Sequence, residues 1–393
     1  MSDVKEILNE IRQNGDKSVL KYNVLFDKNS SLKFRVTKKQ IKEAYKKVDE
    51  ETLLALKYAS KNITRFAKVQ MKQVKEFDLK TNFGILSQKV IPVESAGCYV
   101  PGGNYPLPST ALMTIIPAKV AGVKRVVVCS PKITPLVIVA SDLAGADEIY
   151  NVGGVGAIGA MAYGTKQIKK VDKIVGPGNK YVAEAKKEVY GSVGIDFIAG
   201  PSEVLIVADD SANPKLIAAD LLAQAEHDIN AKANLITTSK RVLIETKLEL
   251  KKQLSGLPTK IIAEQSIKNS KFILVKNFNE AIKIANEFAP EHLEIQAKIK
   301  PQLLDTFNNY GSMFFGECSA ESFGDYCLGP NHTLPTSKAS RYTGGLSVRD
   351  FVKIVTIQKV TKFNKRIIWA SSKIAGVEGL FAHKKSAELR KFC

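Results

Sequence analysis

The stretch VVVCSPKITPLVIVASDLAGADEIYNV, residues 126–152, holds the pattern that decides the fold. Its first apolar run, Val126–Cys129, has the length of a strand, and a helical stretch follows over residues 135–144. A second strand is expected at Glu148–Val152. A strand, a helix and a strand in this order predict a parallel βαβ unit.

The same alternation extends on both sides of this stretch, from Cys98 to about Pro201, and then repeats. In the first set, a further strand and three further helices are expected at Lys173–Val175 and at residues 109–121, 155–163 and 180–190. In the second set, strands are expected at Val204–Ala208, Leu235–Thr238 and Phe272–Val275, and helices at residues 214–227, 241–254 and 278–288. Two successive sets predict two sheet domains of similar design.

We therefore predict an α/β fold with two doubly wound, incomplete Rossmann-like sheet domains and a small C-terminal helical tail. The first domain is expected over residues 98–202 and the second over residues 203–340. The N-terminal segment, residues 1–97, is predicted to be mainly helical, with a short strand pair around Gly84–Val93, and to pack with the second α/β domain. Residues 341–393 are expected to form the separate tail, with a short strand and helices after Gly345.

The charge of the chain raises the question of an anionic partner, because 58 Lys and Arg face 39 Asp and Glu, a net charge of +19. The basic tracts are short, such as Lys38-Lys39 and Lys384-Lys385, and no zinc-finger spacing or aromatic-interleaved basic patch accompanies them. We therefore expect solvated helix faces and no nucleic-acid partner. The charge can still attract an anionic dinucleotide.

The cysteines indicate a reducing compartment. They are five, widely scattered and without a CxxC pair, which favours neither a disulfide framework nor a thiolate zinc site. The N-terminus lacks the apolar core of a signal peptide, and no apolar run has the length of a membrane span. The expected location is the cytoplasm, with no membrane association.

The segment Gly154-Val-Gly156-Ala-Ile-Gly159 matches GxGxxG after an expected strand and at the start of an expected helix. This is the context of a dinucleotide-binding fingerprint. However, the spacing arises easily in a Gly/Ala-rich stretch, and no acidic residue closes a second strand about twenty residues later. Close helix–sheet packing is the alternative interpretation.

The four histidines are the candidates for catalysis and metal binding, because each lies near an acidic or amide side chain. His227 ends a segment in which Asn213 can cap a helix and Pro214 fits its first position. Gln224 precedes His227 by three residues and shares its helix face. The pair could bind a metal, or His227 could cap its own helix, where the dipole favours it.

Glu291 and His292 are adjacent and follow a helix-breaking proline. A carboxylate and an imidazole at a cleft edge suit acid/base catalysis, although an exposed polar pair would have the same sequence. His332 lies with Asp325 in a loop punctuated by glycine and proline, where functional residues are frequent.

The last histidine, His383, follows Glu378 by five residues, so the two would not share a helix face and are expected to hold separate roles. Each histidine could be structural when taken alone. Because all four histidines lie beside polar partners, one shared metal or acid/base site is favoured.

Six longer blocks connect these residues to a known family. They are Tyr99-Val-Pro-Gly-Gly-Asn-Tyr-Pro-Leu-Pro-Ser-Thr, Val175-Gly-Pro-Gly-Asn179, Ala199-Gly-Pro-Ser-Glu-Val, Gln224-Ala-Glu-His227, Ala289-Pro-Glu-His292 and Gly324-Asp-Tyr. In these blocks, and over nearly its whole length, the chain resembles the histidinol dehydrogenase family. Several long blocks in the right order are more specific than any single motif.

The resemblance implies oxidation of L-histidinol through the aldehyde to L-histidine, with reduction of two NAD⁺ and with one Zn²⁺ per subunit. The positions that match the family's zinc ligands are Gln224, His227, Asp325 and His383. A nitrogen and oxygen ligand set without thiolate leaves zinc open to the imidazole and amine of the substrate. Zinc is then expected to orient the substrate more than to generate hydroxide.

Glu291 and His292 match the family's catalytic pair. His292 is expected to take the hydroxyl proton in the alcohol step, and Glu291 to activate water in the aldehyde step. Ser202, His332 and Glu378 match substrate-binding positions, and Glu378 suits a cationic amine or imidazole. The zinc ligands and His292 are also expected to contact the substrate.

Tyr99 and Asn179 match the family's nucleotide-contacting positions, but Gly156 stands where the family often has Gln. The GxGxxG is therefore not the family's motif, and the affinity for NAD⁺ is expected to depend on this difference. The family forms homodimers in which the C-terminal tail of one subunit completes the site of the other. Glu378 and His383 are thus expected to act across the interface.

Two other hypotheses compete with this one. The chain could oxidise another small alcohol, such as a sulfonated diol, although Glu378 and His332 do not suit an anionic substrate. It could also be a non-catalytic zinc-stabilised dimer or a nucleic-acid-associated protein, which the Glu291-His292 pair disfavours.

Overall fold

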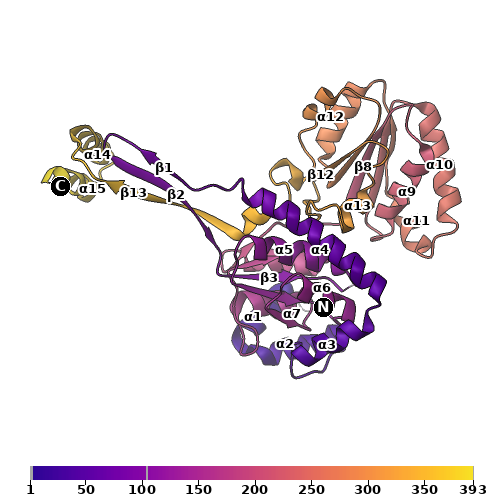
Figure 1. The fold of residues 1–393 in the computed structure, drawn as a ribbon, viewed down its shortest axis with the longest axis horizontal. Helices are drawn as coiled ribbons and strands as arrows, with labels where there is room; N and C mark the ends of the chain where they lie inside the picture. The colour runs from indigo at the N-terminus through magenta and orange to yellow at the C-terminus, as the bar shows by residue number, and fades with distance from the viewer. Residues whose placement is uncertain (1–2, 103–104, 393) are drawn as a thin grey trace. The chain divides into compact units, whose positions relative to one another are not determined.

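The structure is a computed structural model that describes residues 3–102 and 105–392. The chain divides into two units, which contain the elements labelled in Figure 1. Unit 1 comprises Met1–Met71 and Val93–Phe351 and contains two parallel sheets. Unit 2 comprises Lys72–Pro92 and Val352–Cys393 and contains a small antiparallel sheet with two helices.

The first sheet of unit 1 has the strand order β5-β4-β3-β6-β7, and its neighbouring strands are parallel. The strands are β3 Ser95–Tyr99, β4 Arg125–Cys129, β5 Glu148–Tyr150, β6 Lys173–Val175 and β7 Gly194–Ile195. The helices between them are α5 Pro108–Val120, α6 Pro135–Leu143, α7 Gly154–Tyr163 and α8 Lys180–Val189. The strand order reverses direction between β3 and β6, which is the switch point of a doubly wound sheet.

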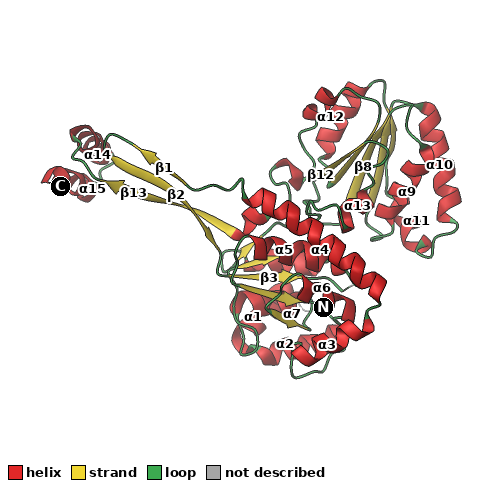
Figure 2. Ribbon diagram, viewed as in Figure 1, coloured by secondary structure: helices red, strands yellow, loops and turns green. Residues whose placement is uncertain are grey.

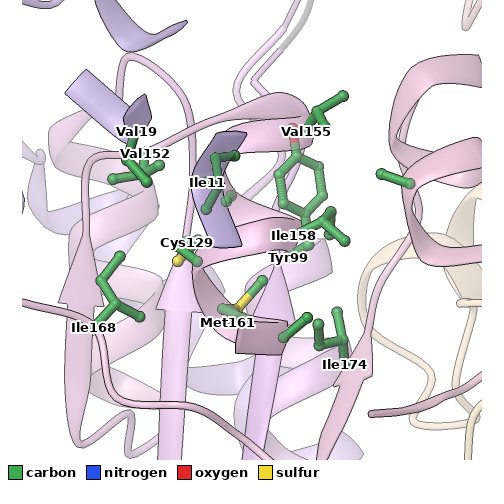
Figure 3. Packing of buried hydrophobic residues seen from close by; sticks show 14 of the residues in the cluster. Ile11, Val19, Tyr99, Cys129, Val152, Val155, Ile158, Met161, Ile168 and Ile174 are labelled. Atoms are coloured by element: carbon green, nitrogen blue, oxygen red, sulfur yellow. The ribbon is translucent and has the colours of Figure 1, made fainter. Parts of the chain in front are cut away.

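The packing of α7 on the core of this sheet explains Gly159. Figure 3 shows Ile158 and Met161 of α7 within the apolar cluster that also contains Tyr99 of β3. A Cβ on Gly159 would lie 3.0 Å from the Cδ1 atom of Ile11, in the N-terminal helix α1 (Val4–Asn14). Gly159 therefore lets α7 pack closely on α1, which supports the packing interpretation for this glycine.

The N-terminal helices pack mainly on the helices of the first sheet. The prediction was that they pack with the second α/β domain. Helix α1 contacts α7 and α8, α3 contacts α6, and α4 contacts α5. The reason is the apolar face of α1, which is buried in the same cluster as α7. Helix α4 also reaches the second domain, because Asn62 Nδ2 donates to Cys327 O at 2.9 Å. The bounds of the other N-terminal helices are α2 Asp16–Tyr22, α3 Lys38–Lys47 and α4 Glu50–Met71.

The second sheet repeats the topology of the first, with the parallel order β10-β9-β8-β11-β12. The strands are β8 Glu203–Ala208, β9 Lys232–Thr237, β10 Phe272–Leu274, β11 His292–Gln296 and β12 Ser312–Phe315. The helices are α9 Pro214–Ala225, α10 Lys240–Leu254, α11 Lys260–Lys268, α12 Phe278–Phe288 and α13 Glu321–Tyr326. Two successive doubly wound α/β sets were predicted, and the structure confirms them.

Helices cover both faces of this second sheet, as Figure 2 shows. Along β8, Val204 and Ile206 are buried in a cluster with α9 and α10, whereas Leu205 and Val207 are buried in a cluster with α12. Successive side chains of a strand point to opposite faces. Every residue of β8 is therefore buried, as in strands of parallel sheets generally.

Unit 2 contains a sheet of the order β1-β2-β13 and the helices α14 Lys365–Val377 and α15 Phe381–Glu388. Its antiparallel strands are β1 Phe77–Lys80, β2 Gly84–Pro92 and β13 Val352–Val360. A strand pair was expected around Gly84–Val93, but that range holds the single strand β2, and its neighbour β1 lies before it. A short strand and helices were expected in the tail, and the strand is β13. Its pairing with β2 was not predicted, and the C-terminal part of unit 2 begins at Val352 instead of residue 341.

The two parallel sheets belong to one compact unit and are joined by hydrogen bonds such as Asn331 Nδ2 to Met113 O, at 2.6 Å. The boundary between residues 202 and 203 remains a prediction. None of the helices in the described residues combines the length and the apolar character that crossing a bilayer requires.

Candidate active site

The site is built at the amino ends of two strands of the second sheet. His292 is the first residue of β11 and pairs in register with Val204 of β8. Ser202 immediately precedes β8, and α9 returns along the sheet and brings Gln224, near its end, to the same edge. Ligand sites of open parallel sheets usually lie at the carboxyl ends of the strands, so this sheet uses its opposite edge.

His292 lies at the centre of the site and is 2 % exposed. Its Nδ1 atom lies 3.2 Å from Oε1 of Gln224 and 3.2 Å from Oε1 of Glu321. Its Nε2 atom lies 3.2 Å from Nδ1 of His332 and 3.6 Å from Oδ1 of Asp325. The amide oxygen of Gln224 can only accept a hydrogen bond, which favours a proton on Nδ1 and leaves Nε2 as the acceptor.

His332 and Asp325 form the second half of the cluster. Nδ1 of His332 donates to Oδ1 of Asp325 at 2.9 Å, and the ring stacks on His292 with centroids 5.2 Å apart. Phe314 of β12 lies against both rings. A Cβ on Gly324 would overlap the ring of His332, so the glycine makes room for it.

Asp325 and Glu321 share one face of α13, because four residues separate them. Burial acts to raise the pKa of Asp325, but the hydrogen bond from His332 and the nearby imidazoles hold that pKa below its usual value. Burial and the charge of Asp325 raise the pKa of Glu321 well above its usual value. One carboxyl group of the pair is therefore kept ionised while the other resists ionisation.

Glu291 is held by backbone groups and is 5 % exposed. Its Oε2 atom accepts a hydrogen bond from the backbone N–H of Glu203 at 3.0 Å, and the Ser202 hydroxyl also bonds to it. The backbone N–H of Gly311 donates to Glu291 O at 3.1 Å. Burial raises the pKa of Glu291 well above its usual value.

Burial lowers the pKa of His292 to about 3. The imidazole is therefore uncharged at neutral pH, which is the form that can accept a proton. A neutral imidazole beside a buried carboxyl group is a suitable pair for acid/base chemistry.

The donor set fits a metal ion. Ligand atoms of His292, Asp325 and His332 lie within 4.8 Å of one another. The Nε2 atom of His332 is buried and has no hydrogen-bond partner among the described residues. Gln224 adds an amide oxygen next to His292. Nitrogen and oxygen donors without thiolate suit zinc in a site with open positions.

Three of the four predicted zinc ligands lie in this part of unit 1. Asp325 belongs to the cluster directly. Gln224 contacts His292, and Nε2 of Gln224 lies 3.5 Å from Nδ1 of His227, which is exposed after the end of α9. The fourth, His383, lies in α15 of unit 2, and the substrate-binding candidate Glu378 ends α14 in the same unit.

The predicted cofactor residues gather at the carboxyl edge of the first sheet. Tyr99 ends β3, and its hydroxyl accepts a hydrogen bond from the backbone N–H of Gly154 at 3.1 Å. Asn179 follows β6 and caps α8, with Oδ1 accepting from the backbone N–H of Tyr181 and Val182. Gly156 lies in the first turn of α7, after β5.

Two residues of the site were not assigned a role from the sequence. Glu321 contacts His292 directly, and Glu203 holds Glu291 through its backbone. The spacing of Glu321 and Asp325 could have indicated Glu321, since i and i+4 residues share a helix face. A backbone donor such as that of Glu203 leaves no signal in the sequence.

Comparisons with known proteins agree over the full length. A family model described as histidinol dehydrogenase matches residues 1–391. Histidinol dehydrogenase of Listeria monocytogenes serovar 1/2a is 46 % identical, over 99 % of this chain and 92 % of its own length. The protein of the same name from Methanocaldococcus jannaschii is 45 % identical, over 98 % and 91 %.

Solved structures give the same result. The crystal structure of histidinol dehydrogenase from Elizabethkingia anophelis superimposes with a TM-score of 0.95 at 39 % identity and covers 99 % of this chain and 92 % of that one. The putative aldehyde dehydrogenase PutA from Anabaena variabilis, at 14 % identity and a TM-score of 0.53, covers 92 % of each chain and shares the fold alone. Both parallel sheets and the site lie within the matched region.

Proposed function

The chain belongs to the histidinol dehydrogenase family, and we propose that it oxidises L-histidinol through the aldehyde to L-histidine while reducing two NAD⁺. It is an oxidoreductase of histidine biosynthesis. The observation that carries the reaction scheme is the buried Glu291-His292 pair beside Gln224, Asp325 and His332.

In the alcohol step, His292 accepts the hydroxyl proton at Nε2 while hydride leaves the carbon for NAD⁺. Burial keeps this imidazole uncharged, and the carboxylate of Asp325, 3.6 Å from Nε2, favours the charged form that results when the proton is taken up. In the aldehyde step, Glu291 takes a proton from water, whose oxygen attacks the carbonyl carbon. Burial makes the Glu291 carboxylate, once ionised, a stronger base than an exposed one.

Of the clustered donors only Asp325 is proposed to hold Zn²⁺, together with Gln224, His227 and His383, while His292 stays free as the base and His332 faces the substrate. The zinc would supply positions for the imidazole and amine nitrogens of the substrate. Ser202 and His332 are proposed to contact the substrate from the amino edge of the second sheet. Glu378 is proposed to bind its cationic amine, and Tyr99 and Asn179 to contact NAD⁺.

We propose a homodimer in which unit 2 of one subunit completes the site of the other. Two predicted site residues, His383 and Glu378, lie in this unit. Large apolar side chains of the unit are exposed, including Trp369 at 66 % and Phe381 at 71 %. They line a groove of about 690 Å³, which suits burial against a second copy of the chain.

We propose the cytoplasm as the place of action. Cys98 and Cys129 are buried free thiols on the neighbouring strands β3 and β4, as expected in a reducing compartment.

The test is an NADH absorbance assay on purified zinc-loaded protein with L-histidinol and NAD⁺. We expect two NADH per histidinol consumed, and histidine as the product. A substrate panel with a sulfonated diol tests the alternative substrate class. No absorbance rise with histidinol would rule the proposed reaction out.

A further inference from the structure

A buried ion pair lies in the core of the first sheet's domain. Lys186 of α8 pairs with Asp196, which follows β7, and their side chains are 3 % and 1 % exposed. Transfer of two charges out of water is unfavourable, and a buried pair often stabilises a protein no better than apolar residues of similar volume. Stability alone is therefore a weak reason for its presence.

Both charged groups bind the same residue of the backbone. Nζ of Lys186 donates to Gly176 O at 2.9 Å, and the N–H of Gly176 donates to Oδ2 of Asp196 at 2.8 Å. Gly176 has a φ of 112°, and a Cβ there would overlap the carbonyl oxygen of Tyr99. The backbone polar groups of Gly176 are thus fixed by two side chains, close against the end of β3.

We call the Lys186–Asp196 pair bound to Gly176 the clamp. The position of Gly176 connects the clamp to the cofactor candidates. Gly176 directly follows β6, and β6 pairs with β3 at the point where the strand order reverses. The crevice at such a point is where open α/β sheets bind their ligands. Tyr99 ends one of these two strands, and Asn179 lies three residues beyond Gly176.

We propose that Lys186 and Asp196 are positioning residues for NAD⁺. Together they hold Gly176 so that Asn179 keeps a fixed distance from Tyr99 across the crevice. This inference rests on the proposed cofactor site and adds to it two residues that do not themselves touch the cofactor. Loosening a loop that carries a ligand contact weakens binding, because ordering the loop then opposes association.

The double variant Lys186→Met/Asp196→Leu tests the proposal without leaving an unpaired buried charge. We expect KM for NAD⁺ and the calorimetric Kd for NAD⁺ to rise about tenfold. KM for histidinol, and kcat at saturating NAD⁺, should stay within about twofold of wild type. The single variant Lys186→Arg, which keeps the charge and the donors, should keep most of the wild-type affinity for NAD⁺.

The matched control is Lys21→Met/Glu10→Leu, which removes the exposed ion pair between α1 and α2 and should leave both KM values unchanged.

If the clamp variant does not fold, Pro177→Gly loosens the same loop outside the core and should also raise the Kd for NAD⁺. A folded clamp variant with unchanged NAD⁺ affinity would overturn the proposal, as would equal rises of both KM values or an unchanged Kd in Pro177→Gly. The Kd measurement separates this result from the proposed reaction, because it needs no histidinol oxidation. A wild-type protein that does not bind NAD⁺ would overturn both.

Discussion

Glu291 and His292 are neighbours in the chain, yet each is held by different partners. Glu291 is bound by the backbone of Glu203, and His292 lies between Glu321 and His332. Side chains with separate surroundings can carry separate steps of one reaction. Substitution of each should therefore slow a different half of the oxidation.

We expect His292→Ala to lower the rate of histidinol oxidation by about 10²–10⁴-fold, because the hydroxyl proton then has no positioned base. Metal analysis should give the same zinc content as wild type. The matched variant Glu291→Gln should slow histidinaldehyde oxidation more than histidinol oxidation in single-turnover assays. Loss of zinc from His292→Ala would instead assign the imidazole to the metal.

Gly156 is the second position where one residue decides a measurable property. It is buried in α7, and a Cβ there would meet its nearest neighbour, Val152, at an ordinary 3.8 Å. Gly156→Gln adds a hydrogen-bonding amide at the carboxyl edge of the first sheet. We expect KM for NAD⁺ to fall several-fold, about 1 kcal/mol in binding, and thermal stability to stay equal or rise.

The control for this variant is Gly159→Ala, one turn along the same helix. Its Cβ would press on Leu8 and Ile11 of α1. It should lower the melting temperature and leave KM for NAD⁺ unchanged. An unchanged KM in Gly156→Gln would show that this turn of α7 does not reach the cofactor.

Three elements meet around buried acidic groups below the site. Glu294 of β11 is 1 % exposed, and its carboxyl group accepts hydrogen bonds from the backbone N–H of Glu321 on α13 and from Nε2 of Gln296. Gln296 also donates to Asp220 of α9 at 3.0 Å. Burial and the charge of Asp220 raise the pKa of Glu294 to about 8.

A raised pKa favours folding with Glu294 protonated, so this stabilisation is complete below pH 4.5 and is lost as the pH rises through 8. Relative to wild type, Glu294→Gln should be more stable at pH 8.5 than at pH 5 by about 4 kcal/mol, because Gln cannot ionise. Urea unfolding at the two pH values measures this. Parallel pH curves for the two proteins would contradict it, and the exposed Glu43→Gln is expected to give such curves.

Three strands of each parallel sheet could be predicted, because buried strands leave uninterrupted apolar runs, as Val126–Cys129 does. Strands β3, β7, β11 and β12 were not expected; in β11 the polar His292 and Glu294 alternate with apolar residues and interrupt such a run. A short strand was expected after Gly345, where β13 lies, but its pairing with β2 was not, because β2 is distant in the sequence. Candidate site residues were found where they are ionisable and next to each other, as in Glu291-His292. Contacts made by the fold, such as that of Glu321 with His292, could not be deduced from spacing alone.

The proposed sharing of sites between two chains has a direct test. His292→Ala and His383→Ala should each be inactive alone. Mixed, unfolded and refolded together at equal amounts, they should recover about a quarter of wild-type activity. Half of the dimers are then mixed, and one of the two sites in each mixed dimer is intact.

As the matched control, each variant is refolded by itself and should stay inactive. If sites were complete within one chain, the mixture would also stay inactive.

Trp369→Glu in the groove of unit 2 should shift the protein toward monomer in size-exclusion chromatography and lower activity in parallel.

The second sheet carries its chemistry at the amino ends of its strands, which leaves the opposite rim for other uses. There, β8 ends at Ala208 and the chain turns through Asp210, whose side chain is 76 % exposed. A peptide inserted after Ser211 would project from the face remote from His292. This rim is therefore a suitable attachment point for immobilising the enzyme on a surface or for a fluorescent reporter, because tethering there should leave turnover intact.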